Sequence, residues 1–313
     1  MPSMVERPDL TVELGRGLRL RSPVMVASGT FGYGFEAPQV DREALGAIVS
    51  KGTTLRAREG NAPIRIAETP SGMLNAIGLQ NPGVDHVARV YAPQWATWDL
   101  PVIVNVAGDS VEEYVAVARR LDGVAGVAGL ELNISCPNVQ SGLQFGVDPA
   151  MAAEVTRAVR AATALPLIVK LTPNVTDIVA IARAVEDAGA DAVSAINTYV
   201  GMSIDVRRRR PVVSSGSGGL SGPAIKPLAL HAVWRVAAEV HIPVIGVGGI
   251  MTPNDALEFL LAGAAAVQLG TVNYIRPQAA AEIQDGIADY LVQHDLSDMS
   301  ALPIRPMSVL TNV

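Results

Sequence analysis

Cysteine is almost absent from this chain of 313 residues, which contains only Cys136. A single cysteine allows no internal disulfide and cannot ligate an iron–sulfur cluster, so we expect a cytoplasmic protein without a cluster of its own. Charged residues are also scarce, at 17% against about 25% in an average soluble protein. This deficit suits a large fold whose parallel strands are buried on both faces.

Long apolar runs and excess positive charge are missing too. No stretch approaches the roughly 20 apolar residues that cross a bilayer, and the N-terminus lacks the apolar core of a signal peptide, so we expect no membrane association. The net charge of −6 argues against nucleic acid as the main partner. The exception is Arg207–Arg210, which we expect to be a solvated loop. The histidines lie away from the predicted strand ends, so we expect no catalytic metal.

Short runs rich in Val, Ile and Ala alternate along the chain with amphipathic stretches of helical length. Eight runs have the length of buried strands: 24–27, 47–51, 102–106, 129–134, 167–171, 192–196, 244–247 and 266–269. The helical stretches between them include 110–121, 149–162, 177–188 and 254–262. Eight such repeats predict an α/β fold of the (β/α)₈ type, the TIM barrel, and disfavour a doubly wound sheet.

The residues before the first predicted strand, and the continuity of the repeats, lead to two further expectations. Residues 10–20 alternate around Gly15-Arg16-Gly17 and predict an N-terminal β-hairpin that caps one end of the barrel. No linker or low-complexity stretch interrupts the repeats, so we expect residues 1–313 to form one domain.

Polar residues or glycines stand at the carboxyl end of every predicted strand. In strand order they are Ser28, Lys51, Asn105, Asn133, Lys170, Asn197 with Thr198, Gly248 with Gly249, and Gly270 with Thr271. In a barrel these ends converge on one mouth, where barrel enzymes have their active sites. Since burying a Lys or Asn without a partner is costly, core packing does not explain the ring. It predicts a binding site.

Lysine usage singles out two members of the ring. Only three of the 24 basic residues are lysines, namely Lys51, Lys170 and Lys226. A lysine kept at the end of an apolar strand suggests a need for a compact ammonium group, since arginine serves elsewhere. Lys51 and Lys170 occupy such positions, whereas Lys226 precedes a proline near a helix start and is expected at the surface.

The segment Asn133-Ile134-Ser135-Cys136-Pro137-Asn138 follows the fourth predicted strand. A cysteine there could act as a base or nucleophile, or could simply be a small buried hydrophobe beside turn-forming residues. The flanking carboxamides could hold a flat ligand with amide-like edges.

Two glycine clusters indicate a phosphate site. Gly246-Val247-Gly248-Gly249 follows the seventh strand, and Gly270-Thr271 ends the eighth. Loops at these two strands commonly form the phosphate cradle of a TIM barrel. The segment 216–222, ahead of a helix near Pro223, could add further N–H donors.

Several motifs together resemble the dihydroorotate dehydrogenase family. They are Asn75-Ala76-Ile77-Gly78-Leu79-Gln80-Asn81-Pro82-Gly83, the segment around Cys136, Lys51-Gly52-Thr53-Thr54, Asn197-Thr198 with Gly201-Met202-Ser203-Ile204-Asp205, and Gly218-Gly219-Leu220-Ser221-Gly222. The match runs from about Val24 to Thr271. It is closest to the class 1B catalytic subunit, because class 2 enzymes carry serine at the position of Cys136 and class 1A departs from this chain at residues 78–81 and 201–205.

The resemblance implies FMN in the barrel mouth with dihydroorotate stacked on it. The FMN contacts it implies are Ser28, Lys51, Asn105, Asn133, Lys170, Ile196, Gly222, Gly248, Gly249, Gly270 and Thr271. The substrate contacts it implies are Lys51, Asn75, Ala76, Ile77, Gly78, Leu79, Asn133, Asn138, Asn197 and Thr198. Cys136 and Lys170 are the implied catalytic residues, the first as base and the second as a cation beside the reduced flavin. Residues 139–148 would form a lid.

The class 1B pattern further implies a homodimer within a heterotetramer. Its second subunit would carry FAD and an iron–sulfur cluster and would reduce NAD⁺. Four alternatives remain open at this point: a class 1A enzyme that reduces fumarate, another FMN barrel such as the dihydropyrimidine dehydrogenase module, a Schiff-base aldolase that uses a strand-end lysine, and a flavin carrier without catalysis.

Overall fold

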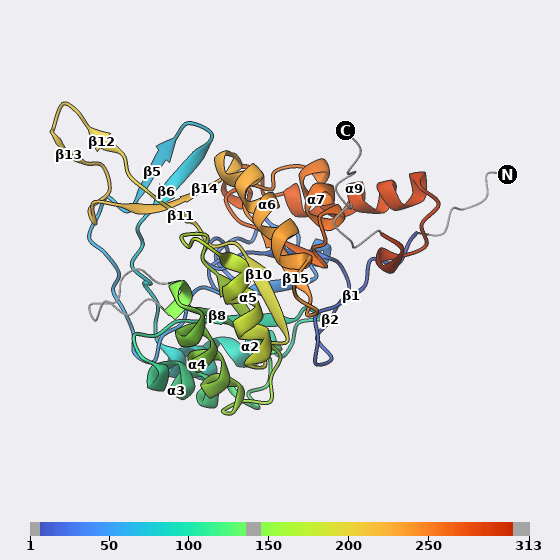
Figure 1. Cartoon of the computed structure of the whole chain (residues 1–313), viewed down its shortest axis with the longest axis horizontal. Coiled ribbons are helices and arrows are strands. Elements are labelled where there is room, and N and C mark those ends of the chain that lie inside the picture. The colour runs from blue at the N-terminus through green and yellow to red at the C-terminus, as the bar shows by residue number, and fades with distance from the viewer. Residues whose placement is uncertain (1–6, 136–144, 303–313) are drawn as a thin grey trace.

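Eight parallel strands close into a barrel in the computed structural model of this chain, which describes residues 7–135 and 145–302 (Figure 1). In chain order they are β3 (Val24–Val26), β4 (Ala47–Val49), β7 (Val102–Val106), β8 (Gly129–Asn133), β9 (Leu167–Leu171), β10 (Ala192–Ala195), β15 (Val244–Val247) and β16 (Ala266–Leu269). Each strand pairs with the next, and β16 pairs with β3. The predicted TIM barrel is therefore confirmed.

Helices surround the barrel, as the amphipathic stretches predicted. The longer ones are α3 (Val111–Leu121), α4 (Pro149–Arg160), α5 (Ile178–Asp187), α6 (Lys226–Ala237), α7 (Pro253–Leu261) and α9 (Ala279–Gln293). The short helices are α1 (Val84–His86), α2 (Ala92–Trp95) and α8 (Val272–Ile275). Side-chain caps fix several starts: Asp148 accepts a bond from the Met151 N–H at 2.9 Å, and Thr252 forms a capping box with Asp255.

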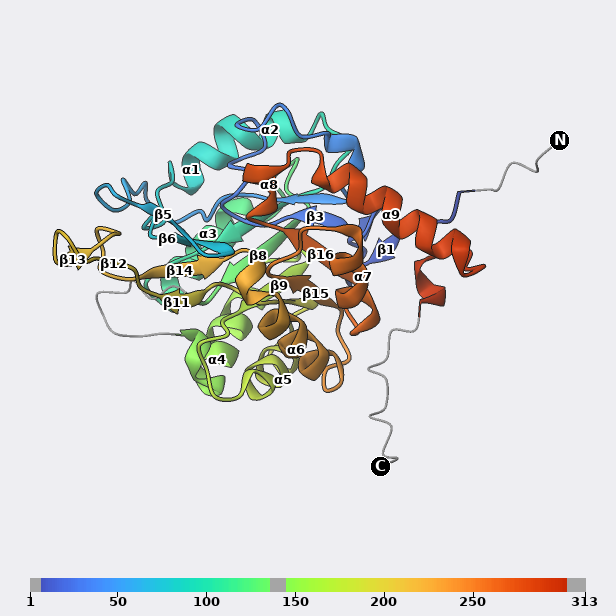
Figure 2. The same ribbon diagram turned by 90° about the horizontal axis from the view of Figure 1, so that it is seen from above.

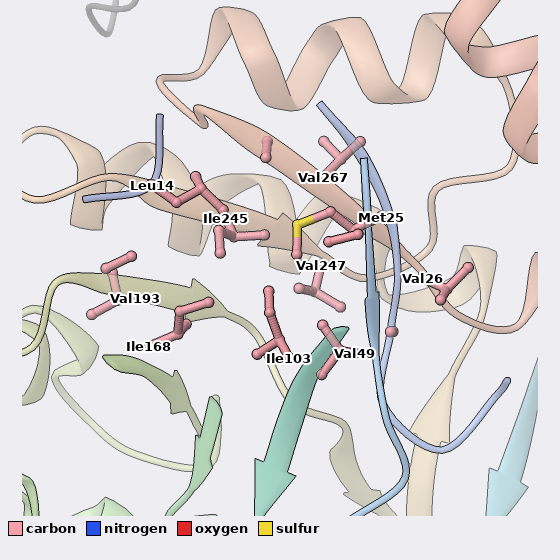
Figure 3. Packing of buried hydrophobic residues seen from close by; sticks show 14 of the residues in the cluster. Leu14, Met25, Val26, Val49, Ile103, Ile168, Val193, Ile245, Val247 and Val267 are labelled. Carbon is pink, nitrogen blue, oxygen red and sulfur yellow. The ribbon is translucent and has the colours of Figure 1, made fainter. Parts of the chain in front are cut away.

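Apolar side chains fill the part of the barrel interior that lies below the polar residues at the carboxyl ends of the strands (Figure 3). Met25, Val49, Ile103, Ile168 and Ile245 are all completely buried there. Neighbouring parallel strands place register partners on the same face, so the pairing of Val49 with Ile103 puts both on the inner side. This packing fixes the positions of the strands. It therefore also fixes the direction in which the side chains nearer the carboxyl ends point.

The N-terminal strands β1 (Val12–Glu13) and β2 (Arg19–Leu20) form the predicted antiparallel pair. Leu14, between them, is completely buried and belongs to the same apolar cluster as Val193 and Ile245 (Figure 3). Arg16 is ion-paired with Asp191, the residue just before β10, at 3.0 Å. The pair therefore covers the amino-terminal end of the barrel.

A second, antiparallel sheet lies at the opposite end of the barrel (Figure 2). It has the order β11-β14-β6-β5, formed by Tyr199–Gly201, Gly218–Ser221, Gly72–Asn75 and Ile66–Thr69. Beyond β11, the strands β12 (Ile204–Asp205) and β13 (Arg210–Pro211) form a hairpin whose four arginines are exposed, as expected. The sequence analysis did not predict this sheet, to which part of the segment 216–222 belongs as β14. Among the described residues no helix is long and apolar enough to span a membrane.

Candidate active site

A cavity of about 570 Å³ lies where the carboxyl ends of the barrel strands meet the antiparallel sheet. Its lining includes every predicted site residue that the structure describes: Ser28, Lys51, Asn75, Ala76, Ile77, Gly78, Leu79, Asn105, Asn133, Lys170, Ile196, Asn197, Thr198, Gly222, Gly248, Gly249, Gly270 and Thr271. Cys136 and Asn138 lie outside the described residues, as does most of the predicted lid. The volume is in the range of small-molecule sites. The structure thus brings the predicted residues together, while their individual roles stay predictions.

A buried polar network lies behind the cavity on the barrel side, and two of its residues, Asn105 and Lys170, line the cavity. Glu131 of β8 is completely buried, and its Oε1 accepts a hydrogen bond from Asn105 Nδ2 at 2.7 Å. Its Oε2 accepts from Ser194 Oγ at 2.9 Å and from Gln268 Nε2 at 2.8 Å. Lys170 Nζ lies 3.6 Å from Oε1. The carboxylate therefore gives the buried Lys170 ammonium the counter-charge it requires.

Strand register explains why these residues meet. Asn105 is the register partner of Glu131, and Lys170 is the partner of both Asn133 and Ser194. Since register partners in parallel strands share a face, all of these side chains project into the barrel. The residues that come nearest to the carboxyl ends reach the cavity, and Glu131 lies beneath them.

Two cations border the cavity on another side. Lys51 follows β4 and, among the described residues, has no carboxylate within 4.0 Å of its ammonium. Burial lowers the pKa of Lys51, nearby Arg65 lowers it further, and Glu36 opposes the shift. Arg65 itself lines the cavity and donates to Gln80 Oε1 at 2.9 Å. This positive region is suited to an anionic group on a ligand.

Asparagines form a third part of the lining. Asn133 Oδ1 accepts from Asn197 Nδ2 at 3.2 Å, and Asn197 Oδ1 accepts from the Thr198 N–H at 2.9 Å. The Asn133 carbonyl is held by the Tyr114 hydroxyl at 2.7 Å. Asn75, on β6, donates to the Gly219 carbonyl of β14 at 3.2 Å. The antiparallel sheet therefore brings Asn75 from a distant part of the chain to the barrel mouth.

Glycines make the fourth side, after β15 and β16. Gly249 has a φ of +74°, and a Cβ there would meet Lys226 N at 2.8 Å and the Gly222 carbonyl oxygen at 2.9 Å. At Gly248, with a φ of +131°, a Cβ would lie 2.7 Å from the Ala229 Cβ. Only glycine fits these close approaches between the β15 loop and the start of α6. Lys226 forms ion pairs with Asp255 and Glu258 and is not part of the lining.

Residues on both sides of 136–144 line the cavity. Ser135 is one of them, and its hydroxyl donates to the Lys170 carbonyl at 3.2 Å. Gly146 and Val147 also line the cavity, and the Gly146 N–H donates to the Ile134 carbonyl at 2.9 Å. Both flanks of the segment that contains Cys136 therefore belong to this site.

Sequence reasoning missed several polar residues of the site. Asn61, Arg65 and Asn174 line the cavity, and Glu131 lies behind it. Asn174 could have been found, since it comes just after β9, whereas Arg65 lies in a long irregular segment without a pattern. Glu131 had a weaker signal, a charge two residues before Asn133 in an otherwise apolar strand.

Comparisons with known proteins identify the family of this chain. A family model described as dihydroorotate dehydrogenase matches residues 10–291. The chain is 55% identical over 300 residues to the "Dihydroorotate dehydrogenase B (NAD(+)), catalytic subunit" of Citrifermentans bemidjiense, covering 95% of this chain and 98% of that protein. It is 57% identical over 296 residues to the protein of the same description in Desulforamulus reducens, covering 94% and 97% of the two chains. The chain therefore belongs to the dihydroorotate dehydrogenase family.

Proposed function

We propose that this chain is the catalytic subunit of an NAD⁺-linked dihydroorotate dehydrogenase that oxidises (S)-dihydroorotate to orotate, a step of pyrimidine biosynthesis, with FMN bound in the barrel mouth. The observation that carries the proposal is the single cavity lined by all the described strand-end residues that the sequence singled out. The identity of 55–57% to proteins described as catalytic subunits of dihydroorotate dehydrogenase B supports the substrate and the acceptor.

The residues of the cavity fit FMN. Asn105 Oδ1 is buried and has no hydrogen-bond partner among the described residues, so it is an acceptor available to a ligand N–H. Lys170 supplies a cation beside it for carbonyl oxygens of the flavin ring. Gly248 and Gly249, with Gly222, Gly270 and Thr271, form a glycine-rich part of the lining suited to the phosphate. When bound, FMN supplies the acceptor for a hydride from substrate carbon C6.

The remaining polar residues suit dihydroorotate. Its ring has amide N–H and C=O groups, and a carboxamide side chain can both accept from such an N–H and donate to such a C=O. This gives a role to Asn75, Asn133 and Asn197. Asn138 is proposed as a fourth such contact, although it lies outside the described residues. The substrate also carries a carboxylate, and the Lys51 ammonium, with Arg65 nearby, offsets that charge.

Cys136 is the proposed base. In the overall reaction carbon C5 loses a proton, which the Cys136 thiolate accepts, and C6 loses a hydride, which leaves a C5–C6 double bond in orotate. Lys170, a cation in the cavity lining, would offset the negative charge that bound FMN gains on two-electron reduction. The placement of Ser135 and Gly146 in the lining supports a role for the segment between them.

Electrons then have to leave the site, and we propose a partner subunit for this step. The chain has a single cysteine and no Gly-x-Gly-x-x-Gly turn for a dinucleotide, so it holds neither an iron–sulfur cluster nor an NAD⁺ site of that kind. The description "catalytic subunit" of the relatives supports a second component. We propose that it carries FAD and an iron–sulfur cluster and joins a homodimer of this chain.

The experiment is a product assay on the purified chain. With dihydroorotate and an artificial electron acceptor, we expect stoichiometric orotate, and with NAD⁺ alone we expect almost none until the partner subunit is added. Absence of orotate with every acceptor would contradict the proposed reaction. Efficient reduction of fumarate would instead identify a different physiological acceptor.

A further inference from the structure

Glu131 is a buried carboxylate that no step of the proposed reaction uses. It is completely buried on β8, and it is not among the residues that line the cavity. Nevertheless, groups from four other barrel strands are directed at its two oxygens: Asn105 Nδ2, Lys170 Nζ, Ser194 Oγ and Gln268 Nε2. Two of these four residues, Asn105 and Lys170, line the cavity.

The first consequence concerns the carboxamide of Asn105. Its Nδ2 is committed to Glu131 Oε1 at 2.7 Å, so its Oδ1 has to face the other way. That oxygen is buried and has no partner among the described residues. A carboxylate only accepts hydrogen bonds, so Glu131 keeps Asn105 in the orientation that offers an acceptor to the ligand.

The second consequence concerns Lys170. Its side chain is 6% exposed, and the Glu131 carboxylate, at 3.6 Å, is the only acidic group within 4.0 Å of its ammonium among the described residues. An ammonium buried to this degree is stable when an anion balances it. Because Ser194 and Gln268 hold the other oxygen of Glu131, the carboxylate cannot follow a ligand into the cavity.

From these contacts we propose that Glu131 is a positioning residue that sets the hydrogen-bond polarity of the flavin pocket and the place of its cation: it makes Asn105 an acceptor and holds the Lys170 ammonium in position. This inference rests on the proposed binding of FMN. The pyrimidine edge of a flavin has an imide N–H next to carbonyl oxygens, which complements an acceptor beside a cation.

The decisive variant is Glu131→Gln, which keeps the shape of the side chain but replaces one acceptor with an NH₂ group. Asn105 can satisfy that NH₂ by turning its carboxamide, and this would direct a donor at the flavin in place of an acceptor. We expect the FMN dissociation constant of the apoprotein to rise roughly 10- to 100-fold, since one buried group is left mismatched. The visible absorption spectrum of bound FMN should also shift.

Two comparisons separate positioning from support of the fold. Thr156→Val removes another fully buried hydroxyl, which donates to the Ala152 carbonyl at 2.7 Å within α4, and should leave FMN affinity unchanged. Glu131→Gln raises the FMN dissociation constant by some factor in the wild type. In an Asn105→Ala background we expect that factor to be at least about threefold smaller, because the two residues act as one unit. Independent, multiplicative effects would overturn the proposal.

A second variant covers the case in which Glu131→Gln does not fold. Ser194→Ala removes one donor to Glu131 without changing the cavity lining, and we expect a rise in the FMN dissociation constant of roughly three- to tenfold. Unchanged affinity in both variants, with FMN bound by the wild type, would overturn the role of Glu131. Failure of the wild-type apoprotein to bind FMN would refute the proposed function itself.

Discussion

The glycine-lined end of the cavity makes a quantitative prediction at Gly249. In Gly249→Ala the added methyl group would lie 2.7 Å from Lys226 Cβ, 2.8 Å from Lys226 N and 2.9 Å from the Gly222 carbonyl oxygen. Two of these three are backbone atoms, one at the start of α6 and one in the turn before it, so they cannot rotate away. The residue also has a φ of +74°. Left-handed backbone costs a non-glycine residue about 1–2 kcal/mol, and overpacking adds about 1–3 kcal/mol.

A matched control exists in the same chain. Gly123 has nearly the same φ, +70°, but a Cβ there would have no atom within 4 Å. Gly123→Ala therefore has only the cost of the left-handed backbone. Alanine also lowers the conformational entropy of the unfolded chain, which offsets roughly 0.4–1 kcal/mol of that cost. The difference between the two variants isolates the contacts with Lys226 and Gly222, and we expect it to be about 1–3 kcal/mol.

Urea unfolding of the apoproteins measures this difference, and FMN titration of the same samples measures its effect on the site. We expect Gly249→Ala to weaken FMN binding more than about tenfold, since the backbone has to shift where the phosphate is proposed to bind. Gly123→Ala should bind FMN like the wild type. Equal unfolding free energies for the two variants, together with normal FMN binding by Gly249→Ala, would refute the reasoning.

Three further predictions concern the chemistry. Cys136→Ser should still bind orotate but reduce flavin at least about 100-fold more slowly at pH 7, because a hydroxyl is a poor base; stopped-flow flavin bleaching measures this, and a near-normal rate would remove Cys136 from the mechanism. Lys170→Arg should be impaired in flavin reduction, since a planar guanidinium does not replace a compact ammonium beside Glu131, and an active variant would contradict this view. The pKa of Lys51 is lowered from its ordinary value of 10.5, so the ammonium begins to lose its proton at a lower pH than a free lysine does. Orotate affinity should therefore fall as the pH rises through the range below 10.5. Lys51→Arg should lack this alkaline decline, and a flat wild-type profile over the same range would show that Lys51 does not hold the carboxylate.

The sequence predicted the barrel and the strand-end residues of the cavity lining because both depend on local patterns. Buried parallel strands such as Leu167–Leu171 are nearly uninterrupted apolar runs, so they stand out from the helices around them. The residue at the carboxyl end of such a strand is then directed to the mouth by the barrel itself.

The antiparallel sheet and the Glu131 network could not be predicted in the same way. The strands β6 and β14 are glycine-containing and mostly half-exposed, so they have no apolar alternation to mark them. Their pairing joins Asn75 to Gly219, which are far apart in the sequence. The partners of Glu131 come from four different strands, and only the register of the closed barrel shows that they meet.

The visible spectrum of the purified chain under anaerobic conditions decides whether the chain binds FMN and reduces it with dihydroorotate. We expect a yellow protein with bound FMN whose flavin absorption is bleached by an equimolar amount of dihydroorotate, with orotate formed in the same proportion. A colourless protein that does not bind added FMN, or a yellow one whose spectrum dihydroorotate leaves unchanged, would contradict this expectation.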